Sequence, residues 1–482
     1  MPNRLTRISS GIEGLDKILC GGLISGSTYI VQGHPGSGKT TLANQIAFHH
    51  AASGQRVLYV TLLAEAHERL FQFLSTFDFY APEQVGRGIA YVSAFMTMQE
   101  DGLDGVVQLL RRELPRHQAT LLVLDGLMNA REHATTSLDV KKFVADLQGH
   151  AGFSGCTALL LTSSRFDDSS PEYTMVDGVI ELAEESIGVR TARHLRVRKA
   201  RGSASLMGLH RYEILDRGVV AYPRLELARR LTSLPDQPST RRVPSGLDDL
   251  DALIGGGLHE GSATLLLGPS GSGKTTCGLH FLARSSVEAP GTLFTFYENP
   301  ERLLLKARAF GLDLDNLVST GALEMMWQSP IESLIDALAE RLLHAVQVRG
   351  VKRLFIDGLG AFERAAMDKA RLAEFFAALI NELRARDVTL LASWELQGML
   401  TRANTLPGPE VFSIADNLLL LRFLETPTRL QRTLSVVKTR DSAVDPAIRG
   451  FRLTRNGIRL IDLPESLNAA PMGPPQPPDH SA

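Results

Sequence analysis

The feature that most constrains this chain is an internal repeat of domain length. Residues 10–28 read SGIEGLDKILCGGLISGST, and residues 245–263 read SGLDDLDALIGGGLHEGSA. An apolar run and a glycine-rich loop accompany each stretch, TYIVQGHPGSGKTT in the first copy and TLLLGPSGSGKTT in the second. Because the period is a whole domain and not one supersecondary unit, a solenoid is excluded. The repeat predicts two tandem copies of one domain.

The elements expected within each copy alternate between short apolar strands and helices. Such alternation is typical of a doubly wound α/β domain, with a mostly parallel sheet and helices on both faces. The strands expected in the first copy are 29–33, 57–62, 121–125 and 158–162, and its helices start at 39, 65 and 138. The strands expected in the second copy are 264–268, 293–297, 354–357 and 389–392. Segments 194–199 and 433–438 alternate with a period of two and are expected as edge strands of hairpins.

Composition shifts divide the chain into four parts. We expect a first ATPase domain over 1–228, a linker over 229–243, a second ATPase domain over 244–463 and a disordered proline-rich tail over 464–482. The linker is polar and contains proline without periodicity, and the tail includes GPPQPP.

The two glycine-rich loops predict two nucleotide sites. Both fit the pattern G-x-x-x-x-G-K-[ST], in which backbone N–H groups and the lysine bind phosphate and the following hydroxyl holds Mg²⁺. The residues expected to bind ATP are Gly33, Gly36, Ser37, Gly38, Lys39, Thr40 and Thr41 in the first copy, and Gly268, Gly271, Ser272, Gly273, Lys274, Thr275 and Thr276 in the second. ATP and Mg²⁺ are therefore the expected cofactors.

An aspartate ends one later apolar strand in each copy. Asp125 ends LLVLD and Asp357 ends LFID, and their separation nearly equals that of Lys39 and Lys274. A carboxylate at the end of a neighbouring strand can hold the metal beside the phosphates. Alone, such an aspartate is usually a turn or helix cap. Its repeated spacing after a phosphate loop favours a Mg²⁺ site formed by Thr40 with Asp125 and by Thr275 with Asp357.

Net charge, cysteine content and the length of apolar runs narrow the class of protein that this chain can be. The formal net charge is -2 and the pI is about 6.7, which argues against a protein that coats nucleic acid. The cysteines Cys20, Cys156 and Cys277 lie far apart, as is common in a reducing compartment. No apolar run approaches the roughly 20 residues that span a bilayer, and Met1 to Gly11 lacks the apolar core of a secretory signal. We expect a cytoplasmic protein without membrane contact.

The opening SG-(I/L)-x-x-L-D, the GG-L-x-x-G stretch, the phosphate loops and the duplication together resemble the KaiC family of RecA-superfamily ATPases. The resemblance covers roughly residues 5–225 and 241–462 and implies two tandem RecA-like P-loop NTPase domains. It also implies a homo-oligomer, a hexameric ring with ATP at the subunit interfaces, and signalling protein partners that the sequence does not identify.

The resemblance assigns further residues. The family's K-x-R-G motif contacts nucleotide on the neighbouring subunit, which points to Lys199 and Arg201 in the first copy and Lys438 and Arg440 in the second. The alternative is that these are solvent-exposed charges on edge strands.

The family also has adjacent glutamates after its second strand, one of them a base for water. Here Glu298 occupies the first position and Asn299 the second, while Glu65 matches only after a one-residue shift. A glutamate favoured at a helix N-terminus is the alternative. The family's phosphorylation site aligns with Phe412-Ser413, where only Ser413 can accept phosphate.

Three functional readings remain open at this point. The first is a KaiC-like ATPase that hydrolyses ATP with Mg²⁺ in a ring, with serine/threonine autokinase activity as an additional option. The second is a nucleotide-gated scaffold with little turnover, which the missing glutamate pair keeps open. The third is a nucleic-acid-dependent ATPase of the RadA or DnaB kind, although segments 128–138 and 362–369 carry no basic cluster.

Overall fold

The computed structural model describes residues 5–132, 136–163, 170–187, 190–228, 239–329, 334–396, 409–426, 429–440, 447–454 and 457–463. The chain divides into two compact units, residues 1–230 and 231–482. Most of the expected linker (229–238) and the whole expected tail (464–482) lie outside the described residues. Within the described part of the chain, every helix is too short or too polar to cross a membrane.

The first unit is built on a nine-stranded sheet. Strands β8, β3, β7, β6, β4 and β5 run parallel, and β9, β10 and β11 extend the sheet in antiparallel fashion. Across the sheet the order is β11 (Gly218–Tyr222), β10 (His210–Leu215), β9 (Arg190–Ala200), β8 (Gly178–Ile187), β3 (Thr28–Gln32), β7 (Thr157–Thr162), β6 (Leu121–Asp125), β4 (Val57–Thr61) and β5 (Ile89–Ser93). A small separate sheet pairs β1 (Arg7–Ile8) with β2 (Leu23–Ile24).

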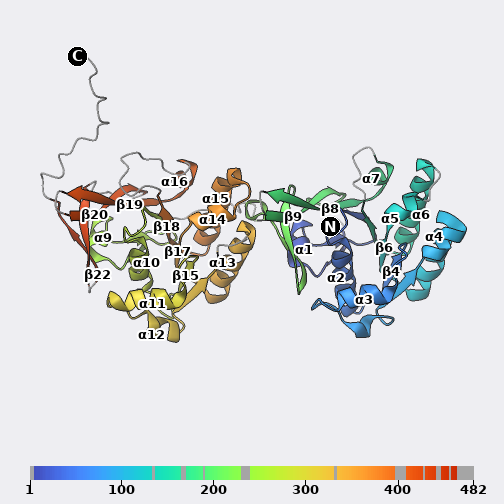
Figure 1. Cartoon of the computed structure of the whole chain (residues 1–482), viewed down its shortest axis with the longest axis horizontal. Coiled ribbons are helices and arrows are strands. Elements are labelled where there is room, and N and C mark those ends of the chain that lie inside the picture. The colour runs from blue at the N-terminus through green and yellow to red at the C-terminus, as the bar shows by residue number, and fades with distance from the viewer. Residues whose placement is uncertain are drawn as a thin grey trace, which may run out of the picture. The chain divides into compact units, whose positions relative to one another are not determined.

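Helices cover both faces of this sheet (Figure 1). One core contains apolar residues of α1 (Glu13–Ile18), α2 (Lys39–Ala52) and α3 (His67–Leu74), and the other contains residues of α4 (Phe95–His117), α5 (Leu127–Glu132) and α6 (Ser137–Phe153). The remaining short helices are η1 (Pro82–Gln84), α7 (Pro171–Met175) and α8 (Leu225–Ala228). The central parallel strands β3, β7, β6 and β4 are buried on both sides, which explains their continuous apolar sequences.

The second unit repeats this order of strands. Its sheet runs β22 (Gly457–Ile461), β21 (Arg449–Thr454), β20 (Arg429–Thr439), β19 (Asn417–Thr426), β14 (Ala263–Gly268), β18 (Thr389–Glu395), β17 (Arg353–Asp357), β15 (Gly291–Thr295) and β16 (Leu323–Trp327). The small sheet pairs β12 (Arg242–Val243) with β13 (Leu258–His259). Arg242 and Val243, which the composition placed in the linker, thus belong to the structure of this unit. The expected fold of tandem α/β domains with mostly parallel sheets is confirmed.

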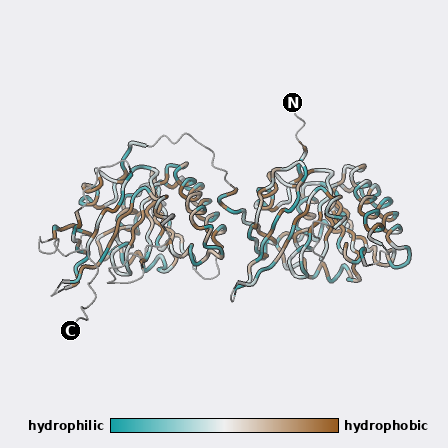
Figure 2. Tube along the Cα trace, turned by 90° about the horizontal axis from the view of Figure 1, so that it is seen from above, coloured by the Kyte–Doolittle hydropathy of each residue, from teal (hydrophilic) through white to brown (hydrophobic). Residues whose placement is uncertain are grey.

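The helices of the second unit again form two groups. They are α9 (Asp248–Leu253), α10 (Lys274–Leu282), α11 (Pro300–Ala309) and α12 (Leu314–Ser319), then α13 (Ile335–Arg349), α14 (Gly360–Ala365), η2 (Lys369–Arg371), α15 (Leu372–Arg384) and α16 (Pro409–Ile414). The core beside α14 and α15 is aromatic, with Phe294, Phe296, Phe362, Phe375 and Phe376 in mutual ring contact. Hydrophobic stretches run through the middle of each unit in Figure 2.

The repeated S-G-x-x-x-L-D stretch forms a local structural clasp. In the first unit Asp16 Oδ1 accepts hydrogen bonds from the Ser10 backbone N–H (2.9 Å) and the Ser10 hydroxyl (2.6 Å). Asp251 accepts the matching backbone bond from Ser245 at 2.9 Å. Gly11 has φ +73°, and a Cβ there would meet the His49 side chain at 2.4 Å. The motif therefore stabilises the entry of the chain into each domain.

One expectation about the later strands is wrong. Segments 194–199 and 433–438 do lie in hairpins, within β9 and β20, but neither strand is at an edge of its sheet. β10 pairs with β9, and β21 with β20, so the true edges on this side are β11 and β22. The alternation in these segments reflects strands with differently buried faces and does not mark a free edge.

Candidate nucleotide sites

Each phosphate loop connects a central strand to a helix. Residues 33–40 join β3 to α2, and residues 268–275 join β14 to α10. The glycines inside the loops adopt the left-handed region, with φ of 84° at Gly36, 88° at Gly38, 75° at Gly271 and 109° at Gly273. Such conformations turn successive N–H groups toward one point and strain any other residue type. The loops and helix N-termini thus form the anion cradle that the motif predicts.

The first glycine and the serine of each loop pack against each other. A Cβ at Gly33 would lie 2.6 Å from Ser37 Oγ, and one at Gly268 would lie 2.9 Å from Ser272 Oγ. Both serine hydroxyls are buried and have no hydrogen-bond partner within the described part of the chain. Buried polar groups normally have partners, so these hydroxyls suit a bound phosphate.

The two lysines lie over their own loops. Lys39 Nζ donates to the Gly33 and His34 carbonyl oxygens at 2.7 and 2.9 Å, and Lys274 Nζ donates to Gly268 and Pro269 at 2.7 Å each. Burial lowers the pKa of both ammonium groups from its usual value, and nearby carboxylates partly offset this effect. A bound phosphate would favour the charged form, because opposite charge counteracts desolvation.

The metal-binding residues expected from the sequence do meet. Thr40 Oγ1 donates to Asp125 Oδ2 at 3.0 Å, and Thr275 Oγ1 donates to Asp357 Oδ2 at 2.9 Å. Burial raises the pKa of both aspartates, while the hydrogen bonds from their neighbours lower it. A buried carboxylate beside a hydroxyl is a hard-oxygen pair that a divalent cation would stabilise. The residues present therefore fit Mg²⁺ in each unit.

A cavity of about 370 Å³ opens beside the first loop. Loop residues line it together with Asp125, the end of β7 and Ile214 of β10. Its lining comprises Pro35, Gly36, Gly38, Lys39, Thr40, Thr41, Leu63, Asp125, Gly126, Met128, Asn129, Leu161, Thr162, Ser163 and Ile214. The position of Thr41 agrees with its expected role, and its counterpart Thr276 is buried in the first turn of α10.

Sequence reasoning missed a buried network behind Asp125. Tyr59 donates its hydroxyl to Asp125 Oδ2 at 3.1 Å, and Asn44 Nδ2 donates to the Tyr59 oxygen at 3.2 Å. Tyr91 in turn donates to Asn44 Oδ1 at 2.8 Å. Burial raises the pKa of Tyr59 well above its usual value, so the hydroxyl remains a donor. The signal was the polar residue type in otherwise apolar strands, but the partners come from separate elements.

The second unit supports its aspartate differently. Ser393 of β18 donates to Asp357 Oδ1 at 2.6 Å and accepts from the Gly358 N–H at 2.8 Å. Arg432 of β20 stacks over Phe423 at 5.5 Å and donates to the Gly271 carbonyl of the phosphate loop at 3.2 Å. The sequence analysis singled out neither Ser393 nor Arg432. The pairing register of β18 places Ser393 beside Asp357, and that of β20 places Arg432 beside the phosphate loop.

The two candidate glutamates lie just before helices. Glu298 and Glu65 each precede the N-cap residue of the next helix, Asn299 of α11 and Ala66 of α3. Measured from the strand ends, Glu65 lies one residue further along than Glu298, so the loop in the first unit is longer by one residue. This extra residue accounts for the shift seen in the sequence. Asn299 caps α11 by accepting from the Arg302 N–H at 3.0 Å.

Both glutamates have basic partners. Lys306 Nζ lies 2.7 and 2.9 Å from the two oxygens of Glu298, which is about a third exposed. Arg69 Nε lies 3.6 Å from Glu65. The negative charges of Glu298 and Glu65 contribute to the raised pKa of Asp357 and Asp125, respectively. Each glutamate therefore lies near its metal-binding aspartate, and Glu298 is held by a two-contact ion pair.

The basic residues at 199, 201, 438 and 440 occupy the opposite end of each sheet. Lys199 is level with Val179 at the start of β8, whereas the phosphate loop follows the other end of β3. The same holds for Lys438, which is level with Leu418 at the start of β19. A β-bulge precedes both lysines at matching positions, between Val179 and Ile180 and between Leu418 and Leu419. These cations therefore lie at the end of the sheet opposite to the phosphate loop of their own domain.

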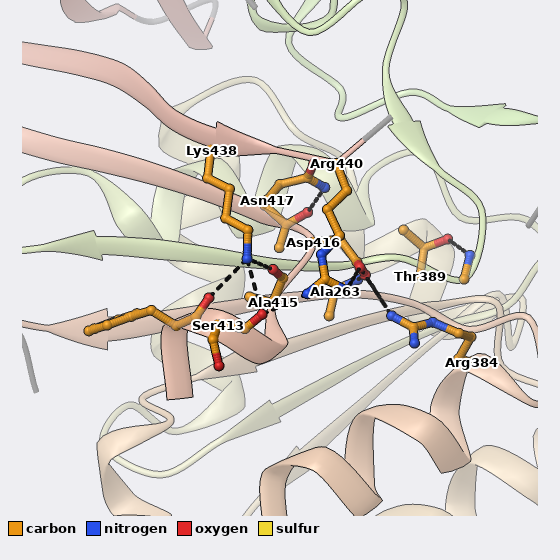
Figure 3. A network of polar contacts seen from close by, with 12 residues as sticks. Ala263, Arg384, Thr389, Ser413, Ala415, Asp416, Asn417, Lys438 and Arg440 are labelled. Carbon is orange, nitrogen blue, oxygen red and sulfur yellow. Dashed lines mark hydrogen bonds and ion pairs between the residues drawn. The ribbon is translucent and has the colours of Figure 1, made fainter. Parts of the chain in front are cut away.

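Figure 3 shows the local surroundings of Lys438 and Arg440. Lys438 Nζ donates to the carbonyl oxygens of Phe412, Ser413 and Ala415 at 3.2, 3.1 and 2.7 Å. Arg440 Nη2 donates to the Ser413 carbonyl at 2.7 Å. Burial lowers the pKa of Lys438, and the charge of Arg440 lowers it further. Two cations therefore share one place beside Ser413, whose side chain is exposed.

The first unit has a similar arrangement. Lys199 Nζ donates to the Tyr173 and Thr174 carbonyls of α7 at 2.8 and 3.0 Å. Arg201 is well exposed and lies 3.9 Å from Asp177. Burial and the charge of Arg201 lower the pKa of Lys199. The pattern of two neighbouring cations thus recurs in both units.

Fold and loops together define a tandem P-loop protein with two RecA-like domains. A family model described as the KaiC ATPase matches residues 8–226 and 243–465, so the chain belongs to the KaiC family. It is 24% identical over 471 residues to a circadian clock oscillator protein KaiC of Picosynechococcus, covering 95% of this chain and 90% of that protein. It is also 24% identical over 473 residues to the circadian clock protein KaiC3 of Synechocystis, with 95% and 92% covered.

Proposed function

We propose that this KaiC-family protein hydrolyses ATP with Mg²⁺ at the subunit interfaces of a ring, and that the ring acts in signalling. The observation that carries the proposal is the pair of complete sites, each with a phosphate loop, a lysine and a threonine–aspartate contact of about 3 Å. The likeness to KaiC proteins over 95% of the chain supports the same conclusion. We propose that the ring is a hexamer.

The residues of each domain would divide the chemistry among them. Backbone N–H groups of the loop, with Lys39 or Lys274, would bind the β- and γ-phosphates. Thr40 with Asp125, and Thr275 with Asp357, would hold Mg²⁺, which neutralises negative charge on the phosphates. Glu298 in the second domain and Glu65 in the first would orient the attacking water.

The basic residues at the far end of each sheet would complete a neighbour's site. Lys199 and Arg201, or Lys438 and Arg440, lie too far from their own loop to act there. In a head-to-tail assembly they would reach the nucleotide of the adjacent subunit and neutralise transition-state charge. Each pair consists of two neighbouring cations and one aspartate, Asp177 or Asp416, that lies 3.9 or 3.5 Å from the arginine, so the net charge of the group is positive and suits an anionic phosphate.

Mass measurement with and without ATP-Mg²⁺, run beside phosphate release, tests this function. We expect nucleotide to shift the protein from small species to a closed assembly that releases phosphate. An unchanged monomer without turnover would contradict the proposal. Assembly without turnover would instead identify a nucleotide-gated scaffold, and turnover that requires DNA would identify a nucleic-acid-dependent ATPase.

A second candidate activity is autophosphorylation of Ser413. The observation that favours it is the contact of Lys438 and Arg440 with the Ser413 carbonyl (Figure 3). If these cations bind a neighbour's γ-phosphate, the exposed Ser413 side chain lies close to the same group. Incubation with γ-labelled ATP and peptide mapping should place label on Ser413 and none on the chain with Ser413→Ala. Label at another residue would refute the site.

A further inference from the structure

The carboxyl end of β18 places an acidic residue beside the second phosphate loop. Glu395, the last residue of β18, is opposite Gly268 in the parallel register, and the next residue donates its N–H to the Gly268 carbonyl at 3.1 Å. β18 lies between β14, which leads into the loop, and β17, which ends at Asp357. The end of β18 therefore lies between the phosphate loop that follows β14 and the aspartate that ends β17.

The alternation of side chains fixes the face on which Glu395 lies. Ser393, two residues earlier on the same strand, reaches Asp357 with its hydroxyl at 2.6 Å. Residues two apart on a strand share one face, so Glu395 lies on the face that carries Ser393, Asp357 and Thr275. Its charge also acts on Lys274, where it is the largest factor that opposes the lowering of the lysine pKa by burial.

The first unit provides an independent check of this position. There β7 is the counterpart of β18, and the pairing of each with its central strand makes Ser163 the counterpart of Glu395. Ser163 lines the cavity that also contains Lys39, Thr40 and Asp125. The position therefore opens onto the nucleotide site, and only the second unit places a carboxylate there.

We propose that Glu395 is a catalytic residue of the second domain and accepts the proton of the attacking water. The inference rests on ATP hydrolysis by this domain. The water oxygen would form a bond to the γ-phosphorus while the bond from the γ-phosphorus to the bridging oxygen breaks. ADP leaves with that electron pair, and the proton of the water passes to the Glu395 carboxylate. The products are ADP, inorganic phosphate and protonated Glu395.

The state of Glu298 supports this division of roles. Its two oxygens both accept hydrogen bonds from Lys306, at 2.7 and 2.9 Å, so this carboxylate is already engaged by a cation of its own domain. Glu395 has no such short contact described with a lysine or arginine side chain among the residues that the structure covers. Glu298 would then orient the water together with Lys306, and Glu395 would take the proton.

The test is Glu395→Gln in the full chain that also carries Lys39→Ala, so that the first domain does not bind ATP. We expect phosphate release to fall by about 10²- to 10⁴-fold while ATP binding is retained. Glu395→Ser, which copies the first unit, should give the same loss. Glu298→Gln in the same background is the matched carboxylate control, and it should lower the rate less than Glu395→Gln.

The outcomes separate this inference from the function on which it rests. Release within twofold of the Lys39→Ala parent, with ATP bound normally, would overturn the role of Glu395 alone. Loss of ATP binding in both Glu395 variants would also overturn it, because the residue would then bind substrate and not react. A parent that binds ATP but releases no phosphate would overturn both the inference and hydrolysis in the second domain.

Discussion

The two units share a fold and a phosphate loop but differ in what surrounds the aspartate that we propose as a Mg²⁺ ligand. In the first unit Asp125 is backed by Tyr59 and the buried Asn44–Tyr91 contact. In the second unit Asp357 is bound by Ser393, and Glu395 lies two residues further along the same strand. The duplicated motif therefore gives both units the same loop and the same threonine–aspartate contact, whereas the residues that support the aspartate differ between the units.

The two units also differ in the strand that contacts the phosphate loop, which is β10 in the first unit and β21 in the second. Tyr212 donates its hydroxyl to the Ser37 carbonyl at 2.6 Å, while its counterpart Phe451 packs against Gly273. At this position the first loop therefore has a hydrogen bond to a tyrosine and the second an apolar contact with a phenylalanine, while the second loop also accepts a hydrogen bond from Arg432 at the Gly271 carbonyl.

The largest expected effect separates the two sites completely. Lys39→Ala and Lys274→Ala should each abolish nucleotide binding in their own unit only, because each lysine contacts its own loop. Equilibrium binding should fall from two nucleotides per chain to one in each variant. A single variant that still binds two would break the assignment of one site to each unit.

Removing Lys438 and Arg440, at the end of the sheet opposite to the phosphate loop, should have the next largest effect on phosphate release. The pair Lys438→Ala and Arg440→Ala, in a Lys39→Ala background, should lower phosphate release by about 10³-fold or more, as loss of an arginine finger does. It should also weaken ATP-dependent assembly measured by light scattering. The matched control is Arg111→Ala with Lys141→Ala, two exposed cations elsewhere. An equal loss in the control would attribute the effect to general charge.

Removing the Tyr59 hydroxyl, which donates to Asp125, should have an intermediate effect on the first unit alone. Tyr59→Phe in a Lys274→Ala background should slow phosphate release about 10- to 100-fold, because one hydrogen bond to a charged group contributes about 1.5–3 kcal/mol. The counterpart in the second unit is Leu293, which has no hydroxyl. Tyr91→Phe, one contact further from Asp125, should have a smaller effect. Equal rates for Tyr59→Phe and its parent would show that Asp125 needs no such support.

The smallest effect concerns acid stability, and it belongs to the first unit. Glu113 of α4 is buried and bound by Arg112 at 2.9 Å and Arg116 at 3.2 Å, and these contacts lower its pKa below the usual 4.5. Because the folded pKa is depressed, its contribution to stability is complete above about pH 4.5 and is lost as pH falls through the folded value. The counterpart in α13 is Ala345.

Unfolding can be followed separately in the two units. Both tryptophans, Trp327 and Trp394, lie in the second unit, so their fluorescence reports that unit, while circular dichroism reports both. Glu113→Gln should flatten the acid dependence of the circular dichroism transition without moving the tryptophan transition. A variant that keeps the full acid dependence would show that Glu113 is not its source.

Features that depend on residues close together in the sequence could be predicted, and features that depend on contacts between distant segments could not. The phosphate loops, the strand-end aspartates and the doubly wound fold depend on residues close in sequence, and their contacts were expected correctly. Strand β16, with sequence LEMMW, was missed because it is short and partly exposed at a sheet edge. The Tyr59–Asn44 contact and the position of Glu395 depend on register between distant segments, which no single stretch of sequence specifies.

The placement of each phosphate loop and each cation pair at opposite ends of one sheet has a consequence for mixtures of chains. Under the proposed arrangement every site is assembled from two halves on two molecules. If both chains also carry Lys39→Ala, a chain lacking Lys274 and a chain lacking Lys438 and Arg440 would each be inactive alone, yet a mixed assembly would regenerate interfaces with both halves intact. With random mixing about a quarter of the interfaces would be complete. Two inactive alleles should therefore complement each other genetically, because the loop and the cation pair of one chain lie at opposite ends of its sheet.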